Sequence, residues 1–272
     1  AHGARGARAG GGEGGDGGLS GKPVGVRREG DVAVLTLQRE EKLNALSGAV
    51  ERALLDALAG DEVKTSRSLV FTGAGKAFSA GADINEFAGT DPASIAAYYA
   101  DTGDVYERIA ALPMPTVAAI HGWCLGGGLE MALATDFRIA DETAAFGLPE
   151  VELGILPSSG GTHRLVRLVG PARAKELMLL RRRFDASEAH AYGLVTEVVP
   201  AGQALERALE VAAELAVLPP LAVETTKRAA DLMPESSREA GMLIERLAYA
   251  ALAQTDEAQK AVEDFTRRGR RP

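Results

Sequence analysis

Hydrophobic and polar residues alternate over residues 24–37, and VAVLTL at 32–37 has the pattern of a half-buried strand. In residues 44–60 (NALSGAVERALLDALAG) the apolar residues recur every three or four positions, which predicts a helix that opens at Asn44. The apolar segment SLVFTGAG at 68–75 predicts a buried strand that ends in a turn. The first part of the chain therefore alternates between strands and helices.

Two glycine-containing junctions follow, each predicted to lead from a strand into a helix. The first is KAFSAGADINEF at 76–87, and a helical region at 91–112 comes after it. The second joins a predicted strand at 116–120 to a helix at 126–134, and another strand is expected at 136–140. The repeated order of strand, glycine turn and helix indicates an α/β core.

The remainder of the chain is mostly helical in pattern. A helix at 162–180 is interrupted at Gly170-Pro171, a short helix follows at 187–192, and TEVVP at 196–200 is a last strand. Residues 1–22 are glycine-rich with scattered charge and are expected to form a tail that buries little. We therefore expect a tail at 1–22, a core at 23–200 and a helical region at 201–272.

Composition limits the classes of function. The 272 residues carry a net charge of -8, which disfavours a general nucleic-acid or membrane-surface role, and no apolar run reaches the length of a membrane helix. A single cysteine, Cys124, fits a reducing compartment, and we expect a cytoplasmic protein. Four histidines and one cysteine form no cluster at metal-ligand spacing, so no metal is expected.

The glycines at 126–128 carry the first candidate chemistry. They leave the backbone bare at a predicted helix start, where N–H groups lack partners and lie at the positive end of the helix dipole. A second such N–H lies near Ala82 in the first junction. If the N–H groups of Ala82 and Gly127 converge, they form an oxyanion hole for a thioester carbonyl. The alternative is that both junctions are ordinary turns.

Two carboxylates accompany the glycines. Glu130 lies among apolar residues, where an idle carboxylate is costly, although it could instead favour the helix dipole or cap the helix start. Glu150 follows twenty residues later and could be either an acid–base group or a solvated loop acid. Glu152, two residues on, is expected to be a surface acid.

Other reactive residues have simpler explanations. His121 and Cys124 are expected to pack, since neither has a partner at triad spacing. Ser158 and Ser159 with His163 do not form the G-x-S-x-G segment of a serine hydrolase. The run at 181–183 (RRR) is either a solvated face or a phosphate contact.

Taken together, these motifs resemble the enoyl-CoA hydratase/isomerase, or crotonase, family. The resemblance covers about residues 24–270 and rests on five segments, namely NALS (44–47), KAFSAGADI (76–84), GWCLGGGLEMALATDFRIA (122–140), FGLPEVELGILPSSGGTHRL (146–165) and DASEAHAYGLVTEVV (185–199). It implies a spiral of β-β-α repeats followed by a helical trimerisation region, with trimers that commonly pair into hexamers. Glu40 departs from the family, which often has proline there.

The resemblance also implies roles for particular residues. Ala82 and Gly127 would supply the oxyanion hole, and Glu130 and Glu150 would be the two acids that family hydratases use. The segment at 80–84 would line the pantetheine and adenine of coenzyme A, and two C-terminal residues would contact the nucleotide; the binding residues are thus Ala80, Ala82, Asp83, Ile84, Gly127, Phe265 and Arg268.

The activity implied is reversible addition of water to a trans-2-enoyl-CoA, as in fatty-acid β-oxidation, giving a 3-hydroxyacyl-CoA. No cofactor is expected, since the coenzyme A belongs to the acyl-CoA substrate. Three alternatives stay open: a double-bond isomerase, another acyl-CoA reaction such as carnitinyl-CoA dehydration or a hydrolysis, and a non-catalytic CoA-binding subunit. The acyl chain length is not predicted, although residues 88–110 are expected to form the variable wall of the acyl pocket. The expected partners are the substrate and further copies of the chain.

Overall fold

The computed structural model describes residues 21–86 and 91–268, without the side chain of Arg268. Within these residues the strands form two sheets. The six-stranded sheet has the order β1-β2-β3-β5-β7-β10, and the four-stranded sheet has the order β4-β6-β8-β9. The strands are β1 (Val24–Glu29), β2 (Val32–Leu37), β3 (Ser68–Gly73), β4 (Ala77–Ser79), β5 (Thr116–Ile120), β6 (Trp123–Leu125), β7 (Phe137–Asp141), β8 (Ala145–Gly147), β9 (Phe184–Asp185) and β10 (Glu197–Val199).

The chain visits the two sheets in turn. After the antiparallel β1–β2 hairpin, strands β3, β5 and β7 add parallel neighbours to the large sheet. Each is followed by a short strand of the small sheet, β4, β6 or β8, and then by helix. This order is the spiral of β-β-α repeats predicted from the family resemblance, and that prediction is confirmed.

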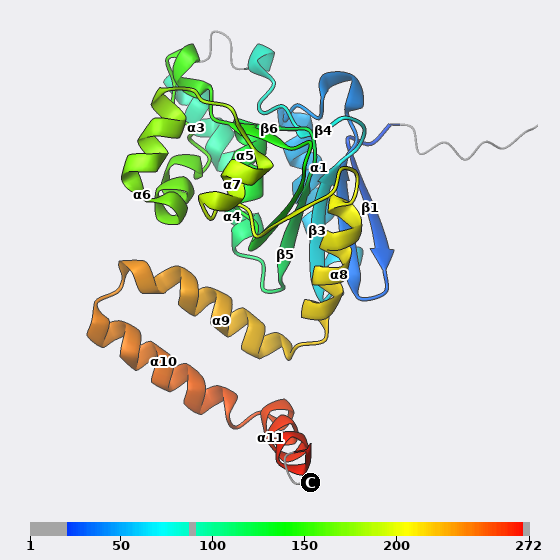
Figure 1. Cartoon of the computed structure of the whole chain (residues 1–272), viewed down its shortest axis with the longest axis vertical. Coiled ribbons are helices and arrows are strands. Elements are labelled where there is room, and N and C mark those ends of the chain that lie inside the picture. The colour runs from blue at the N-terminus through cyan, green and yellow to red at the C-terminus, as the bar shows by residue number, and fades with distance from the viewer. Residues whose placement is uncertain (1–20, 87–90, 269–272) are drawn as a thin grey trace, which may run out of the picture.

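The helices of the core lie around these sheets (Figure 1). They are α1 (Gly48–Leu58), α2 (Asp61–Lys64), α3 (Pro92–Asp101), α4 (Val105–Ala110), α5 (Gly127–Leu133), α6 (Gly161–Leu179), α7 (Ala186–Ala191) and α8 (Ala204–Ala216). As predicted, α6 is interrupted at Gly170, whose φ of 76° and ψ of 160° are not helical. The main apolar cluster lies between α1, α4, α5 and the two sheets.

One local prediction was wrong. The first helix begins at Gly48 with Ser47 as its N-cap, not at Asn44. Asn44 has φ 55° and is buried; its side-chain amide donates to the carbonyl oxygens of Ala74 and Ala77 at 2.8 and 2.7 Å. The first glycine junction leads from β4 into a short 3₁₀ helix, Ile84–Glu86, which precedes α3 in the chain.

Helix α8 belongs to the core rather than to the C-terminal helical region expected from residue 201. Its buried face consists of alanines four residues apart, which allow it to lie close against the large sheet. The buried residues of this second apolar cluster are Val32, Val34, Val70, Val117, Ala119, Ile139, Val199, Ala204, Ala208 and Ala212. The helical region that stands apart from the core therefore begins after α8.

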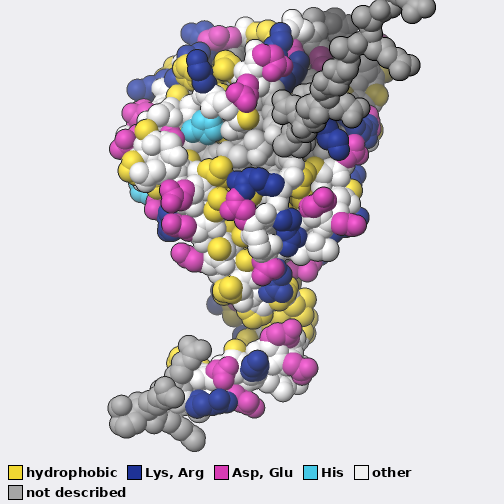
Figure 2. Space-filling model, turned by 90° about the vertical axis from the view of Figure 1, so that its right-hand side faces the viewer, with side chains coloured by type: hydrophobic (Ala, Val, Ile, Leu, Met, Phe, Trp, Pro, Cys, Tyr) yellow, Lys and Arg dark blue, Asp and Glu magenta, His cyan; other side chains and the backbone are white. Residues whose placement is uncertain are grey.

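Helices α9 (Pro220–Leu232), α10 (Arg238–Leu252) and α11 (Asp256–Arg268) extend away from the core as an arm (Figure 1). Figure 2 shows hydrophobic side chains on the surface where this arm leaves the body. The arm exposes large apolar side chains along all three helices: Leu221, Leu232, Leu243, Leu247, Tyr249, Val262 and Phe265.

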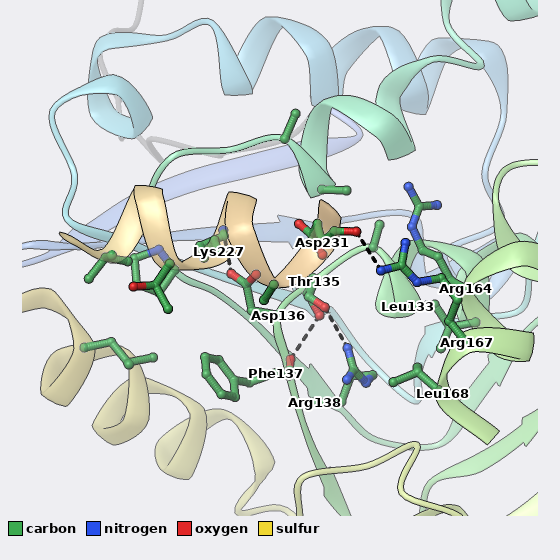
Figure 3. A pocket seen from close by; sticks show the side chains of 18 of the residues that line it. Leu133, Thr135, Asp136, Phe137, Arg138, Arg164, Arg167, Leu168, Lys227 and Asp231 are labelled. Atoms are coloured by element: carbon green, nitrogen blue, oxygen red, sulfur yellow. Dashed lines mark hydrogen bonds and ion pairs between the residues drawn. The ribbon is translucent and has the colours of Figure 1, made fainter. Parts of the chain in front are cut away.

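A groove of about 950 Å³ lies between α9 and the core. Lys227 of α9 forms an ion pair with Asp136 of the core at 2.6 Å (Figure 3). Arg167 of α6 donates a hydrogen bond to the carbonyl oxygen of Asp231 on α9 at 2.8 Å. These contacts fix α9 to the core. Neither Glu130 nor Glu150 lines the groove. Within the described ranges, no helix combines the length and apolar character that crossing a membrane requires.

Candidate active site

The glycines at the start of α5 allow a close approach between two β-α junctions. Gly126 has φ 49° and ψ -126°, a conformation that a side chain would disfavour. A methyl group added to Gly128 would lie 2.6 Å from the carbonyl oxygen of Ser79, at the end of β4. Glycine is therefore required for the start of α5 to lie against the first junction, as the sequence pattern suggested.

Two backbone N–H groups meet at this contact. A methyl group added to Gly127 would lie 3.5 Å from the backbone nitrogen of Ala82. Gly81 and Asp83 make the hydrogen bonds to Leu46, so the N–H of Ala82 points to the other side. Among the described residues, neither the Ala82 N–H nor the Gly127 N–H has a hydrogen-bond acceptor. The arrangement offers two free donors side by side, one at the positive end of a helix.

Glu130 lies on α5 and is 5% exposed. Its side chain does not cap α5; instead its Oε1 accepts from the N–H groups of Ser159 and Gly161 at 2.8 and 2.9 Å. Burial raises the pKa of Glu130, while these two N–H groups and the Arg164 guanidinium lower it. The alternative of a helix-capping role is therefore wrong, and Glu130 is a buried carboxyl tied to the start of α6.

Arg164 supports the same turn and was missed from the sequence. Its Nη1 donates to the carbonyl oxygen of Ser159 at 3.1 Å, and its Nη2 pairs with Glu107 at 2.7 Å. Gly160, with φ 88°, makes room, because a methyl group there would lie 1.9 Å from Arg164 Nη1. Arg164 thus holds the backbone segment whose N–H groups bind Glu130.

Glu150 begins the 3₁₀ turn Glu150–Leu153 and faces Gly126. A methyl group added to Gly126 would lie 3.0 Å from Glu150 Oε1. Its Oε2 is buried and has no hydrogen-bond partner among the described residues. Burial, with a smaller contribution from the charge of Glu130, raises the pKa of Glu150 to about 7. Glu150 is therefore not a solvated loop acid.

The three glycines at 126, 127 and 161 connect the parts of the site. They lie against Glu150, Ala82 and Glu130, respectively, so two free N–H donors and two partly desolvated carboxyls surround one region. Such a set can hold a carbonyl oxygen on which negative charge develops and can transfer protons beside it. The four residues expected to carry chemistry are brought together.

The other predicted binding residues lie at different distances from this region. Ala80 lies two residues before the Ala82 donor and Asp83 directly after it; Asp83 forms an ion pair with Arg39 at 3.0 Å, and Ile84 is 60% exposed. Phe265 is exposed on α11, in the arm, and is not brought to the glutamates within one chain. The side chain of Arg268 lies outside the described residues. The CoA-binding roles of all these residues remain predictions.

The residues expected to be structural do have structural contacts. Cys124 is fully buried, and His121 Nε2 lies 3.3 Å from the carbonyl oxygen of Gly75. His163 is exposed and lies 3.3 Å from Glu235, while the Ser158 hydroxyl accepts a hydrogen bond from Tyr99. Neither Ser158 nor Ser159 pairs with His163 in the part of the chain that the structure describes.

The run at 181–183 makes local contacts. Arg181 pairs with Glu152 at 3.0 Å, which confirms Glu152 as a surface acid, and Arg182 pairs with Glu176 at 2.8 Å. Arg183 lies over the ring of Trp123 at 4.7 Å. These contacts fit the solvated face, and the phosphate contact stays a prediction.

A third carboxyl, Glu51, also escaped the sequence analysis. It is 2% exposed on α1 and accepts hydrogen bonds from the hydroxyls of Tyr98 and Tyr106. The signal was present, because Glu51 lies three and four residues before Leu54 and Leu55 on the apolar face of the predicted helix. Over residues 21–86 and 91–268, no group of three or more His, Cys, Asp or Glu side chains is arranged to hold a metal ion.

Comparison with known proteins identifies the family. The family model for enoyl-CoA hydratase/isomerase matches residues 27–271. A probable enoyl-CoA hydratase of Mycobacterium tuberculosis is 40% identical over 236 residues, which span 86% of this chain and 91% of that protein. A 2,3-dehydroadipyl-CoA hydratase of Escherichia coli is 39% identical over 242 residues, or 88% of this chain and 94% of that protein.

Solved structures agree with this assignment. The crystal structure of an enoyl-CoA hydratase from Bacillus anthracis is similar with a TM-score of 0.83 at 38% sequence identity, covering 90% of this chain and 96% of that one. The chain belongs to the enoyl-CoA hydratase/isomerase family and is an enzyme of this family.

Proposed function

We propose that this member of the enoyl-CoA hydratase/isomerase family adds water reversibly to a trans-2-enoyl-CoA to give a 3-hydroxyacyl-CoA. One observation carries the proposal: the free N–H groups of Ala82 and Gly127 lie beside two desolvated carboxyls, Glu130 and Glu150. The relatives named as enoyl-CoA hydratases support the same reaction.

In this proposal the thioester oxygen accepts hydrogen bonds from Ala82 N–H and Gly127 N–H. Withdrawal of electrons toward this oxygen makes C3 of the conjugated double bond electrophilic, and the negative charge of the enolate is stabilised where it develops. Removing one donor of this kind typically raises the barrier by about 3–4 kcal/mol. Coenzyme A is then part of the substrate, and no further cofactor is invoked.

The two glutamates divide the proton transfers. Glu130 removes a proton from water as the water oxygen bonds to C3, and Glu150 then gives a proton to C2 of the enolate, so that one water is added overall. The pKa of Glu150 is raised to about 7, which lets it hold the proton to be donated. Burial raises the pKa of Glu130, while two N–H groups and Arg164 counteract this shift and favour the ionised form that a base requires.

A double-bond isomerase is the second candidate, and one observation favours it. Glu150 has a buried carboxyl oxygen without a partner among the described residues and a pKa raised to about 7, which suits a single group that carries a proton between two carbons. In that case Glu130 would serve chiefly to hold the start of α6.

Replacement of each acid separates the two reactions. For a hydratase, Glu130→Gln and Glu150→Gln should each lower kcat on a short trans-2-enoyl-CoA by about 10²–10⁴-fold, and the double variant should be scarcely slower than either. The control is Glu152→Gln, which removes only a surface ion pair. If Glu130→Gln keeps more than about a third of the hydration rate, the proposed mechanism is wrong. An isomerase would instead lose double-bond migration only with Glu150→Gln.

We also propose that the chain assembles as a trimer or as a dimer of trimers. Three consecutive helices of the arm expose large apolar side chains that their own core leaves uncovered. Association would cover them and would also give Phe265 a neighbouring surface. In such an assembly Phe265 and Arg268 would meet the nucleotide end of coenzyme A from the end of the arm.

A further inference from the structure

A third carboxyl lies close to the candidate oxyanion donors and is used by neither proton transfer. Glu51 is 2% exposed, and its Oε1 accepts from Tyr98 Oη at 2.6 Å and from Tyr106 Oη at 3.0 Å. Its Oε2 is buried and has no hydrogen-bond partner among the described residues. Thr102 lies near enough to lower the pKa of Glu51 but makes no hydrogen bond of ordinary geometry with Oε2.

This carboxyl belongs to the same region as the reacting groups. A methyl group added to Gly127 would lie 3.5 Å from each of three atoms: Tyr106 Oη, Leu46 Cδ1 and the Ala82 nitrogen. Glu51 also lies close enough to Glu130 that its ionised form raises the pKa of Glu130. An acyl chain whose thioester oxygen is held at Gly127 would therefore pass Tyr106 and reach Glu51.

The hydrogen bonds of Glu51 determine which of its carboxyl oxygens can bind a substrate group. Burial raises its pKa and so favours the neutral form. Because Oε1 already accepts from two tyrosine hydroxyls, Oε2 is the oxygen left to bind a substrate group: it can accept from a hydroxyl when the carboxyl is ionised and donate to an oxo group when it is neutral. A buried polar oxygen left without a partner costs free energy, and a substrate group that supplies the partner removes this cost.

We propose that Glu51 is a specificity-determining residue that selects acyl groups bearing a neutral hydrogen-bonding group, a hydroxyl or an oxo group, beyond the reacting double bond. This inference rests on the proposed hydratase function and names its substrate class. A plain alkyl chain would leave Oε2 unpaired. A terminal carboxylate would add a negative charge to a region where Glu86 and Glu130 already lie close enough to interact electrostatically with Glu51.

In this proposal the acyl chain of the substrate reaches Glu51 from the side of helix α3. Tyr98, which donates to Glu51, lies on α3, and no residue of this helix is fully buried. Tyr106, in contrast, lies on α4 among the buried residues of the main core. The α3 side of the cluster is therefore the wall more easily displaced.

The test compares substrates of equal length on the wild-type enzyme. Initial rates are measured with hex-2-enoyl-CoA, 5-hydroxyhex-2-enoyl-CoA, 6-hydroxyhex-2-enoyl-CoA and 5-carboxypent-2-enoyl-CoA, with crotonyl-CoA as the short reference. We expect kcat/KM for at least one hydroxylated substrate to exceed that for the hexenoyl and carboxy compounds by about tenfold or more. A wild-type enzyme that prefers the alkyl or the carboxy compound overturns the proposal.

Variants of Glu51 then test whether this residue causes the preference for hydroxylated substrates. Glu51→Met keeps the approximate volume but removes the polar group, so it should abolish the hydroxyl preference, with the rate on crotonyl-CoA measured beside it as the reference. Glu51→Gln retains a donor and should keep the preference, which provides a test should the methionine variant fail to fold. Retention of the preference in a folded Glu51→Met variant also overturns the proposal.

The two proposals fail in different ways. If crotonyl-CoA and all the six-carbon compounds are inert while acyl-CoA still binds, the hydratase function is wrong and the specificity proposal falls with it. If crotonyl-CoA is hydrated but no hydroxylated compound is preferred, only the role of Glu51 is wrong.

Discussion

Gly161 lies directly against Glu130: its N–H donates to Glu130 Oε1 at 2.9 Å, and a methyl group on Gly161 would lie 2.6 Å from Glu130 Cγ. The same residue thus holds the carboxyl and leaves space for it. Gly161→Ala should push Glu130 out of position and lower kcat by about 10²-fold or more, with a smaller change in KM.

Gly48→Ala is the matched control for this substitution. An added methyl group at Gly48 meets only Glu86 Oε2 at 3.7 Å, an ordinary contact, and the position lies in the first turn of α1. Its activity should remain within about twofold of wild type. Steady-state rates and melting temperatures of both variants would be measured. A lower rate of Gly161→Ala with a melting temperature equal to that of Gly48→Ala would establish that the substitution acts on the position of Glu130 and not on the whole fold. Full activity of Gly161→Ala would show that Glu130 need not occupy this position.

The pH dependence of hydration should report Glu150. If Glu150 donates a proton, its neutral form is active, so kcat/KM should fall as pH rises above about 7, the pKa of this group. Glu150→Gln should remove this descending limb along with most of the rate. A wild-type profile with no descending limb around this pH would rule out Glu150 as the proton donor.

The same shift predicts a change in stability. The folded-state pKa of Glu150, about 7, lies above the ordinary value of 4.5, so the folded form binds the proton more tightly. This stabilisation is complete below pH 4.5 and is lost as pH rises through about 7. The melting temperature of Glu150→Gln relative to wild type should therefore increase over this pH range, while Glu152→Gln shows no such trend.

Arg164 should set the other limb of the pH profile. Its guanidinium lowers the pKa of Glu130 and binds the Ser159 carbonyl oxygen, so Arg164→Gln should shift the ascending limb to higher pH and lower kcat. Arg167→Gln is the control, because Arg167 lies one turn further along α6 and contacts Asp231 and Glu235 instead. A lower rate with an unchanged profile would indicate a purely structural role for Arg164.

The sequence predicted the candidate site best at positions where the backbone geometry permits only one type of residue. Three glycines at the start of α5, with Ala82 in a similar junction, predicted two free N–H groups, because only glycine permits the close approach of the two junctions. Glu130 was recognisable as an acid in an apolar segment. The family resemblance supplied the roles, and the folded chain adds the contacts between Gly126 and Glu150 and between Gly161 and Glu130.

Other features depend on contacts that local patterns do not contain. Tyr106 approaches Glu51 across 55 residues of sequence, and Arg164 reaches Glu107 across 57. Strands β6, β8 and β9 have three, three and two residues, too few to show a period. Asn44 has the sequence position of a helix start because it precedes an apolar period, but its side chain bonds to a neighbouring loop and turns the chain instead.

Asn44 should consequently contribute much to stability. Its side chain joins the backbone of Arg39, Ala74 and Ala77 through three hydrogen bonds, and the residue is 1% exposed. Asn44→Ala should lower the free energy of unfolding by about 3 kcal/mol, at about 1 kcal/mol for each bond. Denaturant melts would measure this, with Asn85→Ala, which loses only an exposed contact to Asp83, as the control. A loss below about 1 kcal/mol would contradict the assignment.

The arm gives the last prediction, on assembly. Leu247 and Tyr249 of α10 are 62% and 75% exposed in the single chain, and Leu243 on the same helix is 58% exposed. If copies of the chain cover these side chains, Leu247→Glu should place a charge in the interface and convert a trimer or hexamer into monomers. Light scattering at micromolar concentration would measure the mass. Lys260→Glu, a charge change at an exposed position of α11, controls for charge alone and should leave the assembly intact. Wild-type protein that is monomeric at this concentration would refute the assembly proposal, and an unchanged oligomer in Leu247→Glu would place the interface elsewhere on the arm.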